Sequence, residues 1–262
     1  EAIASKLQTL AANLATAESP EVFKRCFSMM DLTTLHTNDT EASVKALVEK
    51  ANGVLSSFEG YPLPASVCVY PNFASVVKEN RCSDELHVTT VAACFPSSQS
   101  YLDVKLLECR MAVRNGADEV DIVLALNYFM AGEYESASRE ISEIRAAIDE
   151  EAAKEDRTVV LKVILETGLL VTEERIANAS FLAMEAGADF IKTSTGKVEV
   201  NATPKAAFVM CESILAYYKA TGRKVGFKAA GGISNAKDAL SYYCIASFVL
   251  GKEWLDKRWF RF

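Results

Sequence analysis

The 262-residue chain is poor in the residue types that many metal and nucleophile sites need. It has only two histidines, His36 and His87, and its seven cysteines include no CxxC pair. A zinc site of the usual ligand spacing is therefore excluded. Serine–histidine catalysis is disfavoured as well, because His87 opens an apolar run, no serine partner marks His36, and a GxSxG elbow is missing.

The cysteines occur singly, and most lie in apolar stretches. Cysteines of this kind are most often plain core residues, and their scattering favours a reducing compartment. We therefore expect a cytoplasmic protein without disulfide bonds. The seven positions are Cys26, Cys68, Cys82, Cys94, Cys109, Cys211 and Cys244.

Long apolar runs are absent too, since none reaches the roughly 18–20 residues that a membrane span needs. The segment Glu1–Leu14 lacks the basic end and apolar stretch of a signal peptide. The formal net charge of −7 argues against nucleic acid or anionic membranes as partners. A small phosphorylated substrate remains compatible with this charge, because a site can be locally basic.

Short β-rich runs alternate with longer helical stretches along the whole chain. No linker or low-complexity tract interrupts it, so residues 1–262 are expected to form one domain, with a helical extension over residues 1–18. Short apolar runs separated by helices predict buried parallel strands. The runs are Ser28–Thr33, Ser66–Tyr70, His87–Cys94, Glu119–Leu124, Val159–Leu165, Asp189–Thr193 and Lys224–Ala229.

Helical spacing connects these runs. Gly-Ala-Asp follows two of the helices, at Gly116 and Gly187, where glycine in a left-handed conformation suits the turn into a strand. The predicted helices are Thr40–Asn52, Tyr101–Asn115, Glu133–Glu155, Thr172–Ala186 and Thr203–Thr221.

Seven strands do not close a barrel, and two segments compete for the eighth. They are Trp259–Phe262 and Ala246–Leu250, and periodicity does not choose between them. An open Rossmann-like sheet is the rival architecture, but no GxGxxG follows an early strand. The expected fold is an α/β (β/α)8 TIM barrel with an extra N-terminal helix.

Four charged residues interrupt otherwise apolar strands: Asp121, Lys162, Lys192 and Lys228. Burying each without a partner is costly, so a shared polar site at the strand ends explains them better than four isolated side chains. Crowded, desolvated lysines have lowered pKa values. A neutral lysine is a nucleophile that can form a Schiff base with a carbonyl, and the pattern does not say which of the three lysines does so.

Two glycine-containing loops follow later strands. Ala229-Ala230-Gly231-Gly232-Ile233 follows the seventh run, where glycines allow a close approach of the backbone to an anion. Thr193-Ser194-Thr195-Gly196-Lys197 follows the sixth, and its hydroxyls and ammonium can reach a phosphate. Together with the lysines, these loops point to a phosphorylated carbonyl substrate.

The lysine-containing strands and the glycine loops resemble those of the deoxyribose-phosphate aldolases, which are class I, Schiff-base aldolases. The resemblance runs through nearly the whole chain in the family's order, and the Phe190–Lys197 run is its most specific part. The matching segments are Met30–Leu35, Val67–Pro71, Gly116–Asp121, Leu161–Gly168, Phe190–Lys197, Val200–Pro204 and Gly226–Gly232.

The resemblance implies an enzyme without metal or cofactor, often dimeric, that cleaves 2-deoxy-D-ribose 5-phosphate to acetaldehyde and D-glyceraldehyde 3-phosphate. It implies that Lys192 forms the Schiff base, that Lys228 lowers the pKa of Lys192, and that Asp121 moves protons with support from Lys162. By the same resemblance, the residues expected to bind substrate are Asp31, Thr33, Thr195, Lys197, Gly231 and Gly232.

The chain departs from the family pattern at two places. Ala229 stands where the family usually has proline. Family members also continue past Phe262 into Gly-x-Ser-Ser, whose serines help to grip phosphate. On this interpretation the eighth strand is Trp259–Phe262, at a truncated C-terminus.

Two other hypotheses stay open. The chain could be a different Schiff-base barrel, such as a transaldolase-like enzyme or another sugar-phosphate lyase. It could also be an inactive barrel that serves as a binding module, although the presence of Lys192, Lys228 and Asp121 argues against this.

Overall fold

A computed structural model describes residues 2–262, with side chains from residue 3 onward. Eight strands form a single sheet in sequential order, and the pairs with assigned register are parallel. Helices separate the strands, so the topology is that of a (β/α)8 barrel, as the sequence predicts. The strands are β1 (Asp31–Thr33), β2 (Ser66–Val69), β3 (His87–Val91), β4 (Glu119–Val123), β5 (Val160–Ile164), β6 (Phe190–Lys192), β7 (Gly226–Lys228) and β8 (Phe260–Arg261).

The five helices predicted from spacing are present as α4, α7, α9, α11 and α12. Several shorter helices lie between them or at strand ends. The α-helices are α1 (Ala2–Ala12), α2 (Leu14–Ala17), α3 (Pro20–Ser28), α4 (Glu41–Asn52), α5 (Val54–Ser57), α6 (Ala74–Asn80), α7 (Leu102–Arg114), α8 (Leu126–Met130), α9 (Tyr134–Ala153), α10 (Thr167–Leu170), α11 (Glu173–Glu185), α12 (Pro204–Thr221) and α13 (Ala236–Leu250), and the 3₁₀ helices are η1 (Pro71–Phe73) and η2 (Lys252–Trp254).

Local chemistry explains where these elements begin and turn. The side chains of Thr40, Thr172 and Thr203 each accept a hydrogen bond from a backbone N–H three residues later, which caps α4, α11 and α12. Gly116 and Gly187 have φ values of 105° and 109°. These angles are in the range that glycine tolerates best, so both Gly-Ala-Asp turns are confirmed.

The eighth strand is Phe260–Arg261, which settles the choice between the two candidate segments. Ala246–Leu250 instead forms the end of α13, a helix capped by the Asn235 side chain. The Phe260 ring stacks on that of Phe227 in β7 at a centroid distance of 5.8 Å. This pairing fixes β8 beside β7 in the register Phe227 to Phe260 and Lys228 to Arg261.

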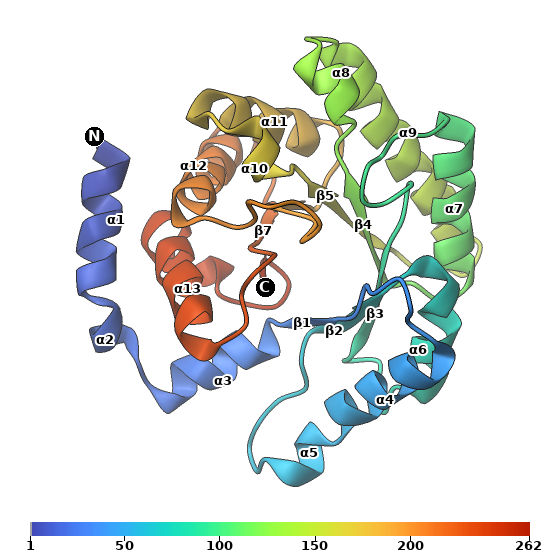
Figure 1. Ribbon diagram of the computed structural model, residues 1–262, viewed down its shortest axis with the longest axis horizontal. Coiled ribbons are helices and arrows are strands. Elements are labelled where there is room, and N and C mark those ends of the chain that lie inside the picture. Colours follow the sequence, from blue (N-terminus) through green and yellow to red (C-terminus); the bar gives the residue numbers. More distant parts are fainter. Residues whose placement is uncertain (1) are drawn as a thin grey trace. The chain divides into compact units, whose positions relative to one another are not determined.

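Contacts divide the chain into two compact units. The first unit contains the residues up to Met29 together with Val163–Phe262, and the second contains Met30–Lys162. In the first unit α1 packs along α12 and α13 (Figure 1). These N-terminal helices agree with the expected helical extension over residues 1–18, of which Glu1 lies outside the described residues. That the whole chain is one domain stays a prediction.

Each unit has its own apolar core. In the second unit, α4 and α6 cover β2 and β3 through buried valines that include Val44, Val67 and Val88. In the first unit, Trp254 is buried and its indole N–H donates to the Val225 carbonyl oxygen at 2.9 Å. The strands thereby hold fixed positions from which their inward side chains can build a site.

Candidate active site

Within the second unit, the ammonium of Lys162 is surrounded by three carboxylates. Its Nζ lies 2.5 Å from Glu119 Oε2, 2.7 Å from Asp121 Oδ1 and 3.6 Å from Asp31 Oδ2. All four side chains have no solvent exposure. Such burial is tolerable because close ion pairs offset part of the desolvation cost. Three predicted site residues, Asp31, Asp121 and Lys162, are thus brought together.

The strand geometry explains how these carboxylates converge. Glu119 and Asp121 are two residues apart on β4, so their side chains point to the same face. Asp31 is the first residue of β1, and its Oδ1 accepts a hydrogen bond from Ser66 Oγ of β2 at 2.8 Å. Thr89 Oγ1 of β3 lies 2.8 Å from Ser66 Oγ, so the network extends across neighbouring strands.

Within the first unit, three cationic residues occupy paired positions on neighbouring strands. Lys192 pairs with Lys228, and Lys228 pairs with Arg261. Paired residues on adjacent parallel strands point to the same face, and the strands are about 4.8 Å apart. All three side chains are buried. The guanidinium of Arg261 donates to the Lys257 carbonyl oxygen and lies 5.8 Å from the Phe190 ring centroid.

The loops after β5 and β6 are joined by Glu166. Its carboxylate accepts hydrogen bonds from the Thr195 backbone N–H at 3.1 Å and from Thr195 Oγ1 at 2.6 Å. Glu166 has a φ of 57°, an uncommon left-handed conformation for a residue with a side chain. The Lys197 N–H in turn donates to Thr195 Oγ1 at 3.0 Å. The predicted residue Thr195 therefore belongs to an ordered loop.

The two glycines after β7 also have left-handed backbones, with φ values of 87° for Gly231 and 82° for Gly232. A Cβ on Gly231 would lie 2.6 Å from Asn201 Cβ, whereas one on Gly232 would have nothing within 4 Å. Gly231 is required both for its conformation and for this close approach. Thr193 Oγ1 ties this loop to the previous one, because it donates to the Ala230 carbonyl oxygen and accepts from the Ala230 N–H, both at 3.0 Å.

Four buried side-chain atoms have no hydrogen-bond partner among the described residues. Thr90 Oγ1 lies on β3, whereas Thr167 Oγ1, Ser194 Oγ and Asn201 Oδ1 lie in the segments that follow β5 and β6. Buried hydroxyl and amide oxygens are normally hydrogen-bonded, so such atoms call for water or a ligand as a partner. A ligand rich in hydroxyl or phosphate oxygens would suit them.

Not every predicted site residue joins these buried groups. Thr33 is exposed and donates to the Asp31 carbonyl oxygen at 2.8 Å, and Lys197 is exposed at the loop after β6. Conversely, sequence reasoning missed Glu119, Glu166 and Arg261. Glu119 had a signal, because it alternates with Asp121 in the run Glu119–Val123, whereas Glu166 is placed only by its unusual backbone conformation.

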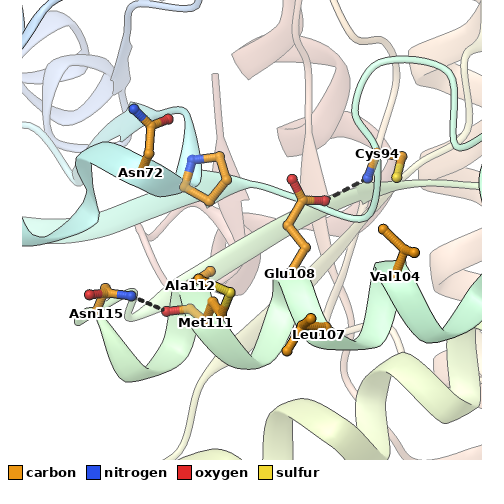
Figure 2. A pocket seen from close by; sticks show the side chains of 9 residues that line it. Asn72, Cys94, Val104, Leu107, Glu108, Met111, Ala112 and Asn115 are labelled. Atoms are coloured by element: carbon orange, nitrogen blue, oxygen red, sulfur yellow. Dashed lines mark hydrogen bonds between the residues drawn. The ribbon is translucent and has the colours of Figure 1, made fainter.

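Figure 2 shows a separate cavity in the second unit, between α7 and the η1 segment, with a volume of about 430 Å³. Glu108 lies in it and accepts a hydrogen bond from the Cys94 backbone N–H at 2.7 Å. The α7 side chains Val104, Leu107 and Met111 supply an apolar wall. No predicted site residue lines this cavity.

In the part of the chain from residue 2 to residue 262, no group of three or more His, Cys, Asp or Glu side chains is arranged to hold a metal ion. No helix in that part has the length and apolarity that a membrane span requires. The expected absence of a metal or cofactor stays a prediction.

Comparisons with known proteins agree on one family. The model of the DeoC/LacD family aldolases matches residues 26–243. A Caenorhabditis elegans protein whose name assigns it as a deoxyribose-phosphate aldolase is 38% identical over 259 residues, which cover 98% of this chain and 82% of that protein.

Solved structures give the same result for the fold. A Coccidioides immitis structure with the same assignment has a TM-score of 0.73 at 25% identity, covering 92% of this chain and 90% of the other. A deoxyribose-phosphate aldolase of Aeropyrum pernix, described as a tetramer, has a TM-score of 0.68 at 26% identity and covers 85% and 84% of the two chains.

Proposed function

Because the chain belongs to the DeoC/LacD family of aldolases, we propose that it cleaves 2-deoxy-D-ribose 5-phosphate reversibly through a Schiff base on Lys192. The products are acetaldehyde and D-glyceraldehyde 3-phosphate. The observation that carries this proposal is the direct pairing of Lys192 with Lys228 on β6 and β7, both buried. The family makes the chain an aldolase, and this pair supplies a means of activating an amine.

The surroundings of the lysines favour Lys192 over Lys162 as the nucleophile. Lys162 is held by three carboxylates, which stabilise its charged form. Lys192 is buried with Lys228 at the paired position, and both desolvation and a neighbouring cation favour a neutral amine. A neutral lysine attacks carbonyl carbon. Lys228 keeps the role that the family resemblance implies, as the cation that lowers the pKa of Lys192.

The proposed cycle begins when Lys192 attacks the substrate aldehyde and water leaves, which forms an iminium ion. The bond between the second and third substrate carbons then breaks as a base removes the proton of the hydroxyl on the third carbon. The iminium nitrogen accepts the electron pair, so an enamine remains and glyceraldehyde 3-phosphate departs. Protonation of the enamine carbon and hydrolysis release acetaldehyde and free Lys192.

We assign the proton transfers to Asp121, directly or through a water molecule, with Lys162 holding its carboxylate. The contact of 2.7 Å between Lys162 Nζ and Asp121 Oδ1 supports this pairing. Asp31 shares the same ammonium and would help to orient substrate hydroxyls. Thr33, the exposed last residue of β1, stays a proposed substrate contact.

We assign the phosphate to the loops after β6 and β7. Gly231 and Gly232 have left-handed backbones, a conformation that often turns successive backbone N–H groups toward a bound anion. Lys197 is an exposed residue and would add an ammonium. Thr195 would add a hydroxyl by turning its proton from the Glu166 carboxylate to the phosphate. The substrate is thus a small phosphorylated sugar, and no nucleic acid or membrane partner is proposed.

We also propose a cytoplasmic location in deoxyribonucleotide and carbohydrate catabolism. The seven cysteines are all free in the structure, which suits a reducing compartment. A homodimer is the proposed assembly, and the Aeropyrum pernix relative, which is a tetramer by its description, shows that members of the family can assemble.

Borohydride reduction in the presence of acetaldehyde tests the mechanism. We expect a two-carbon adduct on Lys192, located by peptide mass spectrometry and absent from Lys192→Ala. A coupled assay for glyceraldehyde 3-phosphate, with deoxyribose 5-phosphate as substrate, tests the reaction. An adduct only with a larger ketose would favour a transaldolase-like enzyme, and neither adduct nor turnover would favour an inactive binding module.

A further inference from the structure

A continuous chain of polar contacts leads from His87, at the beginning of β3, to Asp121. His87 Nδ1 lies 2.7 Å from Glu119 Oε1, and Glu119 Oε2 lies 2.5 Å from Lys162 Nζ. Lys162 Nζ then lies 2.7 Å from Asp121 Oδ1. The last three side chains have no exposure, whereas the His87 side chain is 37% exposed and is in contact with solvent.

The two middle residues of this series of contacts, Glu119 and Lys162, each interact with more than one partner. The Lys162 ammonium is shared by Glu119, Asp121 and, at 3.6 Å, Asp31, so a weaker hold by Glu119 strengthens its interaction with the two aspartates. The Glu119 carboxylate contacts His87 through one oxygen and Lys162 and Thr89 through the other. A positive charge on the imidazole would therefore offset the charge of Glu119 and leave Lys162 more available to Asp121.

We propose that Glu119 and His87 are positioning residues that set the proton affinity of Asp121 through Lys162. The inference rests on the proposed function, in which Asp121 exchanges protons with the substrate. When His87 is charged, Lys162 stabilises the Asp121 carboxylate more strongly, and Asp121 is the stronger acid. When His87 is neutral, Glu119 draws Lys162 away, and Asp121 is the stronger base.

Other charged groups near His87 are engaged with one another. Arg81 Nη1 lies 2.6 Å from Asp118 Oδ2, and Arg81 Nη2 lies 2.7 Å from Asp84 Oδ1. Asp118 also accepts a hydrogen bond from the Val88 N–H at 2.8 Å. On β2, the residue paired with His87 is the uncharged Ser66. Glu119 is thus the carboxylate through which the charge of His87 acts.

Two substitutions at His87 isolate this charge. His87→Asn keeps a neutral N–H donor near the position of Nδ1, and His87→Lys supplies a cation at all pH values of interest. The measurement is the pH profile of kcat/KM for cleavage of deoxyribose 5-phosphate. We expect the acidic limb to lie at higher pH in His87→Asn than in His87→Lys by about 0.5 unit or more, with the parent protein between them.

Glu119→Gln tests whether the effect passes through this residue. In that background the acidic limbs of the His87→Asn and His87→Lys proteins should coincide, because the shared carboxylate is gone. His36→Asn is the matched control, since His36 is the other histidine and its side chain is 75% exposed. Its profile should follow that of the parent protein.

The outcomes separate the two proposals when the same samples are trapped with acetaldehyde and borohydride. Coincident limbs in His87→Asn and His87→Lys, with a Lys192 adduct present, overturn the positioning role alone. An equal fall in rate without separation of the limbs shows a merely structural role and also overturns it. If the parent protein forms no adduct, both the proposed function and this inference are overturned. Should Glu119→Gln fail to fold, the comparison of His87→Asn with His87→Lys still tests whether the charge at His87 shifts the acidic limb.

Discussion

Lys192 and Lys228 are directly paired residues on neighbouring parallel strands, and both are buried. Two ammonium groups in this arrangement disfavour each other's charge, whereas the ammonium of Lys162 in the other unit has three carboxylates around it. Of the three lysines that the sequence could not rank, Lys162 is therefore distinguished from Lys192 and Lys228 by its carboxylate neighbours. We expect Lys162 to contribute mainly to the stability of the fold and Lys192 mainly to the reaction.

Replacing Lys162 and Lys192 with methionine, one at a time, separates the two effects. Lys162→Met leaves Asp31, Glu119 and Asp121 buried without their ammonium, and it should lower the free energy of unfolding by about 3–5 kcal/mol. Lys192→Met removes a buried cation paired with Lys228 and should lower the free energy of unfolding by less than Lys162→Met does, while abolishing turnover. Urea unfolding and the coupled assay measure the two effects. Equal stability of the two variants would contradict the ion-paired assignment of Lys162.

The two glycines after β7 should differ in their tolerance of alanine. Gly232→Ala meets no neighbour within 4 Å, and its φ of 82° alone should cost about 1–2 kcal/mol. Gly231→Ala has the same strain and a Cβ 2.6 Å from Asn201 Cβ, so the loop must shift. We expect a lower Tm and a higher KM for the phosphorylated substrate in Gly231→Ala than in Gly232→Ala. Indistinguishable variants would show that the approach to Asn201 is unimportant.

Acid should weaken the contact between α7 and α9. Hydrogen bonds from Arg114 and then Lys154 lower the pKa of Glu151 from 4.5 to about 2. A lowered pKa in the folded protein means that this stabilisation is present above pH 4.5 and is lost as the pH falls toward 2.

Glu151→Gln should therefore be less stable than the parent protein at pH 7, by about 1 kcal/mol because its cationic partners are exposed and screened. The difference should shrink as the pH falls below 4.5. Urea unfolding across this range measures it. Glu155→Gln, at an exposed carboxylate paired with Arg157, serves as the control and should show almost no loss. A difference that stays constant with pH would refute the assignment.

The cysteines should fall into reactive and inert groups. Cys82 is exposed, whereas Cys109 and Cys211 are buried. Burial raises the pKa of the Cys109 thiol to about 12 and raises that of Cys211 as well, so neither forms a thiolate near neutral pH. Mass spectrometry after brief treatment with a thiol reagent should find Cys82 labelled and the other two labelled only after unfolding. Early labelling of Cys109 would contradict its packing.

Much of the fold could be predicted because buried parallel strands are apolar and the helices between them are long and capped. The bounds were less predictable. Ser28–Thr33 was expected to be a strand, but Ser28 ends α3 and β1 begins at Asp31. Helices of four or five residues, such as α5, α8 and α10, are too short to show a helical period.

The site was predictable where a charge interrupts an apolar run, as at Asp121 and Lys162. Glu119 begins its strand and so looks like an ordinary polar boundary, although it is buried beside Lys162. Glu166 depends on a left-handed backbone and on contacts with a loop 29 residues away, which local patterns do not encode. Long-range pairing, rather than composition, decides these positions.

The hydroxyl of Thr193 accepts the Ala230 N–H and donates to the Ala230 carbonyl oxygen. A single oxygen atom therefore connects the segment that follows Lys192 with the segment that contains Gly231 and Gly232. Because Thr193 holds both the N–H and the carbonyl oxygen of Ala230, the loop after β6 and the loop after β7 are restrained to move together. If the proposed function holds, these two hydrogen bonds keep the Lys192 amine at a set distance from the loop assigned to the phosphate, and the enzyme would prefer substrates of one length.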